Sequence, residues 1–288
     1  MIKGAWNIKL YCHLELYSGD ISFVEANLNH MWLSEWHVGD ENILEPVLVS
    51  CKLPNTYSST VRTVALSIKP CKSFSAKLNM HEAIANTTTA EGDNAFRIAV
   101  CVKPLHFAED ISRKLIAWIE MNKLLGADSI EMYVGDVHPR TWKVLQWYMS
   151  RADDIVHVHN YTSLTELVSG VWQRRRDELI SYNDCLYRNI RSSRFILPVD
   201  IDEIIVPRRV YTWQQLLSRF FTSESLFLLN EYASFLVRNA YFMDQFTDTK
   251  HRSQYSISLL DNVVRSELSP DGESGKSFVS TANSLASH

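Results

Sequence analysis

From Phe96 onward, the sequence alternates between short apolar runs and longer amphipathic segments. The apolar runs have the length of strands, and the amphipathic segments place their apolar residues at helical spacing. A chain that repeats this alternation builds right-handed βαβ units, in which parallel strands form a sheet with helices packed on it. We expect strands over residues 96–105, 129–135, 154–161 and 194–200, and helices over 109–127, from Pro139 onward, over 173–192 and over 212–221.

The first two predicted helices carry end signals. Gly126 follows the first helix, where glycine readily adopts the left-handed conformation of a C-cap. Pro139 opens the second, because proline is favoured in the first helical turn. These signals support helices that end and begin at these residues.

Residues 1–92 have a different character. Their short apolar runs are broken by polar residues and prolines, which is typical of a β-rich region, and the polar stretch 81–94 is predicted to be a linker or surface loop. With 46% hydrophobic and 22% charged residues, the 288-residue chain has the composition of one large α/β domain or two smaller ones. We therefore expect an α/β protein with a smaller β-rich region over 1–92 and a nucleotide-binding domain over 93–288.

Charge and hydropathy exclude two classes of partner. The net charge is −4 and the Lys and Arg residues are dispersed, so the basic surface of a nucleic-acid-binding protein is missing. No stretch approaches the roughly 18 consecutive apolar residues of a membrane helix. We expect neither nucleic-acid binding nor a membrane span within these residues.

The five cysteines are far apart and include no Cys-x-x-Cys pair, so a zinc cluster is not expected. Cys51 and Cys71 both lie in apolar, strand-like surroundings. They form a disulfide if the chain is secretory, or two buried thiols if it is cytosolic. The odd count leaves at least one thiol unpaired within the chain.

The strongest chemical signal is a run of carboxylates at the end of the fourth predicted strand. Asp200 and Asp202 alternate with an apolar residue, so both side chains can point to one face. Two such carboxylates repel each other unless a cation neutralises them, and Mn²⁺ or Mg²⁺ favours oxygen ligands completed by substrate phosphates. The pair therefore predicts a metal site that stabilises a diphosphate leaving group. Glu203 is a third ligand, an acceptor that supports the ligands, or a plain surface carboxylate.

Several other polar residues are considered as ligand-binding candidates, and for some of them two interpretations stay open. Lys103, at the end of the first strand, either neutralises phosphate or is an exposed charge. Asp184 and Arg188 either form a helical i,i+4 pair or reach the nucleotide. His157 and His159 share one face of a strand without a third ligand nearby, and we interpret them as ordinary strand residues.

Four segments in the same order resemble glycosyltransferase family 92. They comprise residues 98–139, 178–189 (ELISYNDCLYRN), 198–207 (PVDIDEIIVP) and 275–288, and the resemblance covers roughly 96–288. It implies a GT-A-type, Rossmann-like fold with a mostly parallel sheet. It also implies a metal-dependent, inverting transfer of a hexose, with galactose from UDP-galactose as the best-known donor, to a glycan on a glycoprotein or glycolipid.

The resemblance also suggests roles for individual residues. Asp200 and Asp202 would bind Mn²⁺ or Mg²⁺, and the stretch Tyr182, Asn183 and Asp184 would line the donor site. We add Arg188 and Lys103 to the donor-binding candidates.

The resemblance further implies Golgi residence through an N-terminal membrane anchor, for which no segment of this sequence is suited. Similar chains continue past residue 288, so we expect the domain to be truncated at its C-terminus. An inverting transfer needs a general base C-terminal to the metal motif. Asp244 and Asp248 are available, but nothing singles either out, and no catalytic base is assigned.

Two other functions compete with this one. A catalytically inactive module would bind nucleotide-sugar or glycan without turnover, which the expected truncation at the C-terminus favours. A nucleotidyltransferase would need a glycine-rich phosphate loop after the first strand, and residues 102–110 contain no glycine. The leading hypothesis is therefore a glycosyltransferase.

Overall fold

The computed structural model describes residues 9–33, 43–53, 61–70, 77–80, 96–151, 155–162, 170–243, 261–262 and 264–284. The chain divides into two compact units. One comprises residues up to 88 together with 164–180, and the other comprises 89–163 and 181–287. The domain boundary expected at residue 92 stays a prediction.

The N-terminal unit contains a five-stranded antiparallel sheet in the order β3-β2-β1-β4-β5. Its strands are β1 (Tyr11–Leu16), β2 (Ile21–His30), β3 (Val47–Cys51), β4 (Val61–Ser67) and β5 (Lys77–Asn79). Buried and exposed positions alternate along β4, as expected for a sheet with one face on a core. That core includes Leu14, Leu16 and Val61.

The disulfide of this sheet differs from the suggested pair. Cys51 at the end of β3 is bonded to Cys12 of β1, so a Cys51–Cys71 disulfide is wrong. The two strands flank β2, where Cys12 pairs with Val24 and Cys51 with Ala26, and the Cα atoms of the two cysteines lie 6.1 Å apart. Sequence spacing carries no information about this register. Cys71 lies outside the described residues.

The second unit contains a six-stranded sheet in the order β10-β11-β9-β6-β7-β8. Its strands are β6 (Ile98–Phe107), β7 (Ser129–Val137), β8 (Val156–Asn160), β9 (Phe195–Val199), β10 (Ser234–Arg238) and β11 (Gly275–Ser280). The pairings β9–β6, β6–β7 and β7–β8 are parallel, whereas β10–β11 and β11–β9 are antiparallel. The α/β class is confirmed, and the sheet is mixed.

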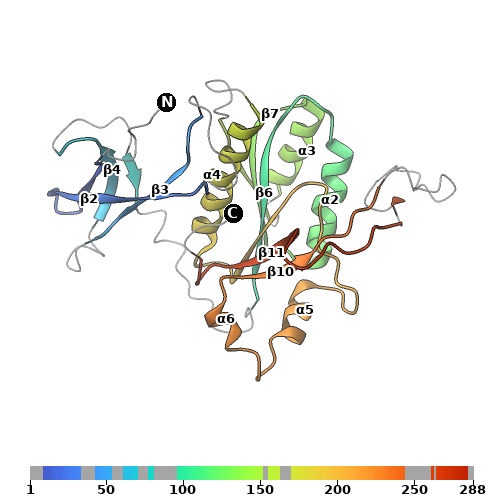
Figure 1. Ribbon diagram of the computed structural model, residues 1–288. Coiled ribbons are helices and arrows are strands. Elements are labelled where there is room, and N and C mark those ends of the chain that lie inside the picture. Colours follow the sequence, from blue (N-terminus) through green and yellow to red (C-terminus); the bar gives the residue numbers. More distant parts are fainter. Residues whose placement is uncertain are drawn as a thin grey trace. The chain divides into compact units, whose positions relative to one another are not determined.

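Helices cover both faces of this sheet (Figure 1). The helices of the described residues are α2 (Ser112–Leu125), α3 (Pro139–Met149), α4 (Val171–Asn189), α5 (Trp213–Phe220) and α6 (Leu228–Glu231). Val100 of β6 belongs to the larger core with residues of α2 and α3, while Cys101 belongs to a second cluster with Leu186 of α4. Successive strand residues therefore face opposite helical layers, as the alternation of a strand requires.

The predicted helix ends are confirmed. Gly126 caps α2 in the left-handed conformation, at φ 100°, and Pro139 is the first residue of α3. A Cβ atom at Gly126 would also lie 2.1 Å from the side-chain oxygen of Gln214, so a larger residue here would displace that side chain as well as strain the backbone. No described helix has the length and apolar character needed to cross a membrane.

The strand order reverses at β6. From β6 the chain moves to β7 and β8 on one side, and β9 then pairs with β6 on the other side. In open α/β sheets, ligands bind at the carboxyl ends of strands beside such a reversal. β6 itself continues to Phe107, beyond the expected end at residue 105. The pairing with β7 shifts register between Val102 and Leu105, where Pro104 lacks an N–H to donate.

Candidate functional site

The acidic turn, which we define as Asp200–Glu203, follows the fully buried strand β9 at the point where the strand order reverses. Its two ends are joined by reciprocal hydrogen bonds. The backbone N–H of Glu203 donates to the carbonyl of Asp200 at 3.0 Å, and the N–H of Asp200 donates to the Glu203 carboxylate at 3.0 Å. Ile201 packs against the main core. The backbone of the turn is therefore fixed by hydrogen bonds at both ends and by the packing of Ile201 on the core.

Two buried tryptophans extend this support. The indole N–H of Trp118 in α2 donates to the carbonyl of Glu203 at 2.9 Å, and that of Trp213 in α5 donates to the carbonyl of Ile205 at 2.7 Å. Both side chains are fully buried. Our sequence reasoning missed these positioning residues. The available signal was chemical, because a buried indole N–H needs an acceptor.

Three lysines from three different elements surround the acidic turn. Lys103 of β6 lies 3.5 Å from one oxygen of Asp200, and Lys276 of β11 lies 4.0 Å from the other. Lys276 also forms a closer ion pair with Glu203, at 2.8 Å. Lys114 of α2 pairs with Asp202 at 3.6 Å. The structure thus brings the predicted Lys103 to the predicted Asp200, and it adds Lys114 and Lys276, which sequence reasoning missed.

The turn has the oxygen atoms that a hard divalent cation prefers. Oδ1 of Asp200 is buried and accepts no hydrogen bond, and the Asp202 side chain is 64% exposed. Within the described part of the chain, no three His, Cys, Asp or Glu side chains gather into a metal cage. A cation held by Asp200 and Asp202 would therefore complete its coordination with ligand phosphates and water, as Mg²⁺ commonly does. The residues fit such a cation, and the metal assignment stays a prediction.

A shallow cavity of about 340 Å³, open to solvent, lies beside the turn. Most of its lining groups are polar or glycine. The lining residues are Glu203, Leu236, Asn239, Gly272, Glu273, Ser274, Gly275 and Lys276. Glu203 belongs to the turn, Lys276 is ion-paired with it, and both line the cavity, so a ligand in the cavity would touch the carboxylate cluster.

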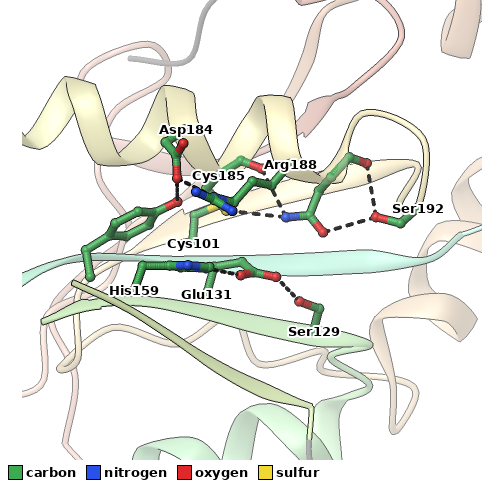
Figure 2. Close-up of a disulfide and its surroundings, with 10 residues drawn as sticks. Cys101, Ser129, Glu131, His159, Asp184, Cys185, Arg188 and Ser192 are labelled. Carbon is green, nitrogen blue, oxygen red and sulfur yellow. Dashed lines mark hydrogen bonds and ion pairs between the residues drawn. A yellow bond between two sulfur atoms is a disulfide. The ribbon is translucent and has the colours of Figure 1, made fainter. Parts of the chain in front are cut away.

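A second polar cluster lies between β6, β7 and α4, around the Cys101–Cys185 disulfide (Figure 2). Asp184 accepts hydrogen bonds from the Tyr133 hydroxyl at 2.7 Å and from Nε of Arg188 at 2.5 Å. Burial, together with the hydrogen bond to Asp184, raises the pKa of Tyr133, so the phenol stays a donor. Asp184 and Arg188 thus form the helical i,i+4 pair, one of the two alternatives predicted for them.

The remaining donor candidates on α4 are buried. Tyr182 is 8% exposed and belongs to the apolar cluster around Cys185, while Asn183 is 4% exposed. Donor binding by Tyr182, Asn183, Asp184 and Arg188 stays a prediction.

A buried carboxylate lies on the same face of the sheet as Tyr133 (Figure 2). Glu131 of β7 is 5% exposed and forms a 2.6 Å hydrogen bond with Nε2 of His159, while the Ser129 hydroxyl donates to its other oxygen. Burial alone would raise the pKa of Glu131, but the hydrogen bonds with His159 and Ser129 outweigh it and lower the pKa below its ordinary value. His159 is therefore a strand residue with a specific partner, which strand periodicity did not reveal.

This lowered pKa predicts a pH-dependent loss of stability in the Glu131→Gln variant. Because the folded-state pKa lies below the unfolded value, the ionised carboxylate stabilises the fold fully above the unfolded pKa, near 4.5. We expect Glu131→Gln to lower the free energy of unfolding by about 2 kcal/mol at pH 7. The difference from wild type should shrink as the pH falls through the lowered pKa. Urea unfolding at pH 7 and pH 3 measures it, and a pH-independent difference would contradict the assignment.

Comparison with known protein families matches residues 96–288, more than half of the chain, to glycosyltransferase family 92. The chain belongs to this family. The match begins two residues before β6 and covers the whole six-stranded sheet, the acidic turn and the cavity. The N-terminal five-stranded sheet lies outside the matched residues.

A distant relative is the beta-1,4-galactosyltransferase galt-1 of Caenorhabditis elegans, which is 23% identical over 193 residues. The alignment covers 66% of this chain and 42% of the relative. The chain thus matches less than half the length of that relative. Asp244 and Asp248, the acidic residues available as a general base, lie outside the described residues.

Proposed function

We propose that this protein transfers a hexose from a nucleotide-sugar to a glycan acceptor. The observation that carries the proposal is the acidic turn, which presents Asp200 and Asp202 at the reversal of strand order in a family 92 domain. The name of the galt-1 relative supports galactose as the sugar and UDP-galactose as the donor. A glycan on a glycoprotein or glycolipid is the proposed acceptor.

The chemistry of the turn suits a diphosphate leaving group. Asp200 and Asp202 would hold Mn²⁺ or Mg²⁺, which neutralises the negative charge that develops on the diphosphate as the sugar departs. The hydrogen bonds and tryptophan contacts fix the turn before ligand binds, so little reorganisation is needed during the reaction. We propose an inverting reaction, in which a general base activates the acceptor hydroxyl.

The topology supports a GT-A-type assignment. Four strands, β9, β6, β7 and β8, run parallel with helices on both faces, and the carboxylates follow the strand beside the reversal. The antiparallel pair β10 and β11 extends this sheet beyond β9 and lines the cavity. On this proposal the parallel strands form the nucleotide side of the site, and the antiparallel pair forms its sugar side.

Two disulfides support a location in the secretory pathway. Cys12–Cys51 and Cys101–Cys185 both need an oxidising compartment to form and persist. Together with the family membership, they favour residence in the Golgi.

Thermal shift with UDP and Mn²⁺ tests the proposal. We expect the two ligands together to raise the melting temperature of the wild-type protein and to leave Asp202→Ala almost unshifted, because the variant lacks one proposed metal ligand. Equal stabilisation of both proteins would reject the metal site. A parallel transfer assay separates the enzyme from a binding module, since a module binds UDP and Mn²⁺ without releasing UDP from UDP-galactose.

A further inference from the structure

We propose that Lys276 binds the distal phosphate of the nucleotide-sugar, the phosphate bonded to the sugar. This assignment rests on the proposed function and adds a residue to it. Lys276 lies in β11, far along the chain from the acidic turn, and nothing in the carboxylate motif points to it.

The register of β11 places Lys276 at the turn. Val279 pairs with Ile196 and Ser280 with Phe195 in antiparallel register, so position 276 lies level with the carboxyl end of β9. The ammonium is held there by Glu203 at 2.8 Å, and its side chain is 25% exposed. Lys276 is thus anchored in the lining of the cavity, beside Glu203.

The ammonium keeps donors available for a ligand. A lysine ammonium has three N–H donors, of which the contact with Glu203 uses one. Asp200, at 4.0 Å, is beyond the range of a hydrogen bond. A phosphate oxygen at the cavity mouth would supply a closer acceptor than Asp200 does.

The balance of charge favours a diphosphate. The carboxylates of Asp200, Asp202 and Glu203 are matched by three ammonium groups, so the cluster by itself is close to neutral. A divalent cation at the aspartates adds two positive charges and weakens the electrostatic attraction between the carboxylates and the lysines. The two negative charges of a nucleotide-sugar diphosphate restore the balance.

The surroundings of the three lysines distinguish Lys276 from the others. Lys114 pairs with the exposed Asp202, and Lys103 lies at the bulge of β6 beside Asp200. Among the three, Lys276 lines the cavity, together with Asn239 and Ser274. If the cavity takes the sugar ring, then Lys276, between the cavity and the acidic turn, lies within reach of the phosphate bonded to that ring.

Calorimetric titration with UDP and with UMP, both in the presence of Mn²⁺, tests the assignment. We expect Lys276→Met to weaken UDP binding by about tenfold or more, the usual effect of losing a charged hydrogen bond. UMP lacks the distal phosphate, so its affinity should change by less than about twofold. Lys276→Arg should retain most of the UDP affinity. Lys123→Met is the matched control, because Lys123 on α2 pairs with Glu120 and leaves the turn intact.

The outcomes separate this inference from the proposed function. Wild-type protein that fails to bind UDP with Mn²⁺ overturns both. Wild-type binding with equal UDP affinity in Lys276→Met overturns the assignment of Lys276 alone. Equal loss of UDP and UMP affinity in that variant, with a lowered melting temperature, shows a structural role and also overturns the assignment.

Discussion

Asp200→Asn is expected to lower the rate of sugar transfer by at least about 100-fold, because the substitution removes a proposed ligand of the cation that stabilises the departing diphosphate. The same variant should be less stable without any ligand. Asp200 lies between Lys103 and Lys276, and a neutral amide leaves both half-buried ammonium groups without that counter-charge. We expect the free energy of unfolding to fall by about 1–3 kcal/mol.

Asp202→Asn is the matched control for this experiment. Its side chain is 64% exposed and its pair with Lys114 is long, so its loss should change stability by less than about 0.5 kcal/mol. The transfer rate should nevertheless fall as it does for Asp200→Asn. Steady-state transfer assays with Mn²⁺ and urea unfolding without it give the two readouts. An Asp200→Asn protein with wild-type Mn²⁺-dependent transfer would refute the metal assignment.

Removal of the Cys101–Cys185 disulfide is expected to destabilise the six-stranded unit by about 2–5 kcal/mol. The bond joins β6 to α4 across a sequence separation of 84 residues, so its loss frees a long loop in the unfolded chain. Cys185 is also the neighbour of Asp184, whose contact with Tyr133 joins the same helix to β7. Urea unfolding of Cys101→Ala/Cys185→Ala measures the loss, and we expect weaker binding of UDP with Mn²⁺.

Cys12→Ala/Cys51→Ala removes the other disulfide and serves as the comparison. That bond lies entirely within the N-terminal sheet, outside the residues matched to family 92. We expect it to lower the stability of its own sheet and to leave UDP affinity within about twofold of wild type. A loss of UDP binding as large as in the Cys101→Ala/Cys185→Ala variant would show that the family 92 domain depends on the N-terminal sheet.

Features encoded locally could be predicted from the sequence. The alternation of strands and helices from Phe96 is confirmed because periodicity depends on neighbouring residues alone. The ends of α2 and α3 followed from the backbone preferences of Gly126 and Pro139. Asp200 lies directly after β9, as predicted. A charged carboxylate is costly within a fully buried strand and is favoured at its solvent-accessible end.

Features that join distant parts of the chain could not be predicted. The pairing of Cys51 with Cys12 depends on strand register, and the contact of His159 with Glu131 depends on which strand β8 joins. Lys276 belongs to β11, a strand that the sequence pattern did not predict. A single sequence describes each residue's chemistry, but the partner of a buried charge is set by tertiary folding.

The order of the strands along the chain also affects how the domain folds during synthesis. β6 occupies the interior of the sheet and is translated first of its strands, whereas β11, which pairs directly with β9, is the last described strand. On the ribosome, the acidic turn therefore emerges before Lys276, the nearest counter-charge of Glu203, has been made. Non-local pairings of this kind form slowly. Until β11 docks, Glu203 lacks its lysine partner and the edge of β9 is open, so we expect the nascent domain to be most prone to aggregation at this stage.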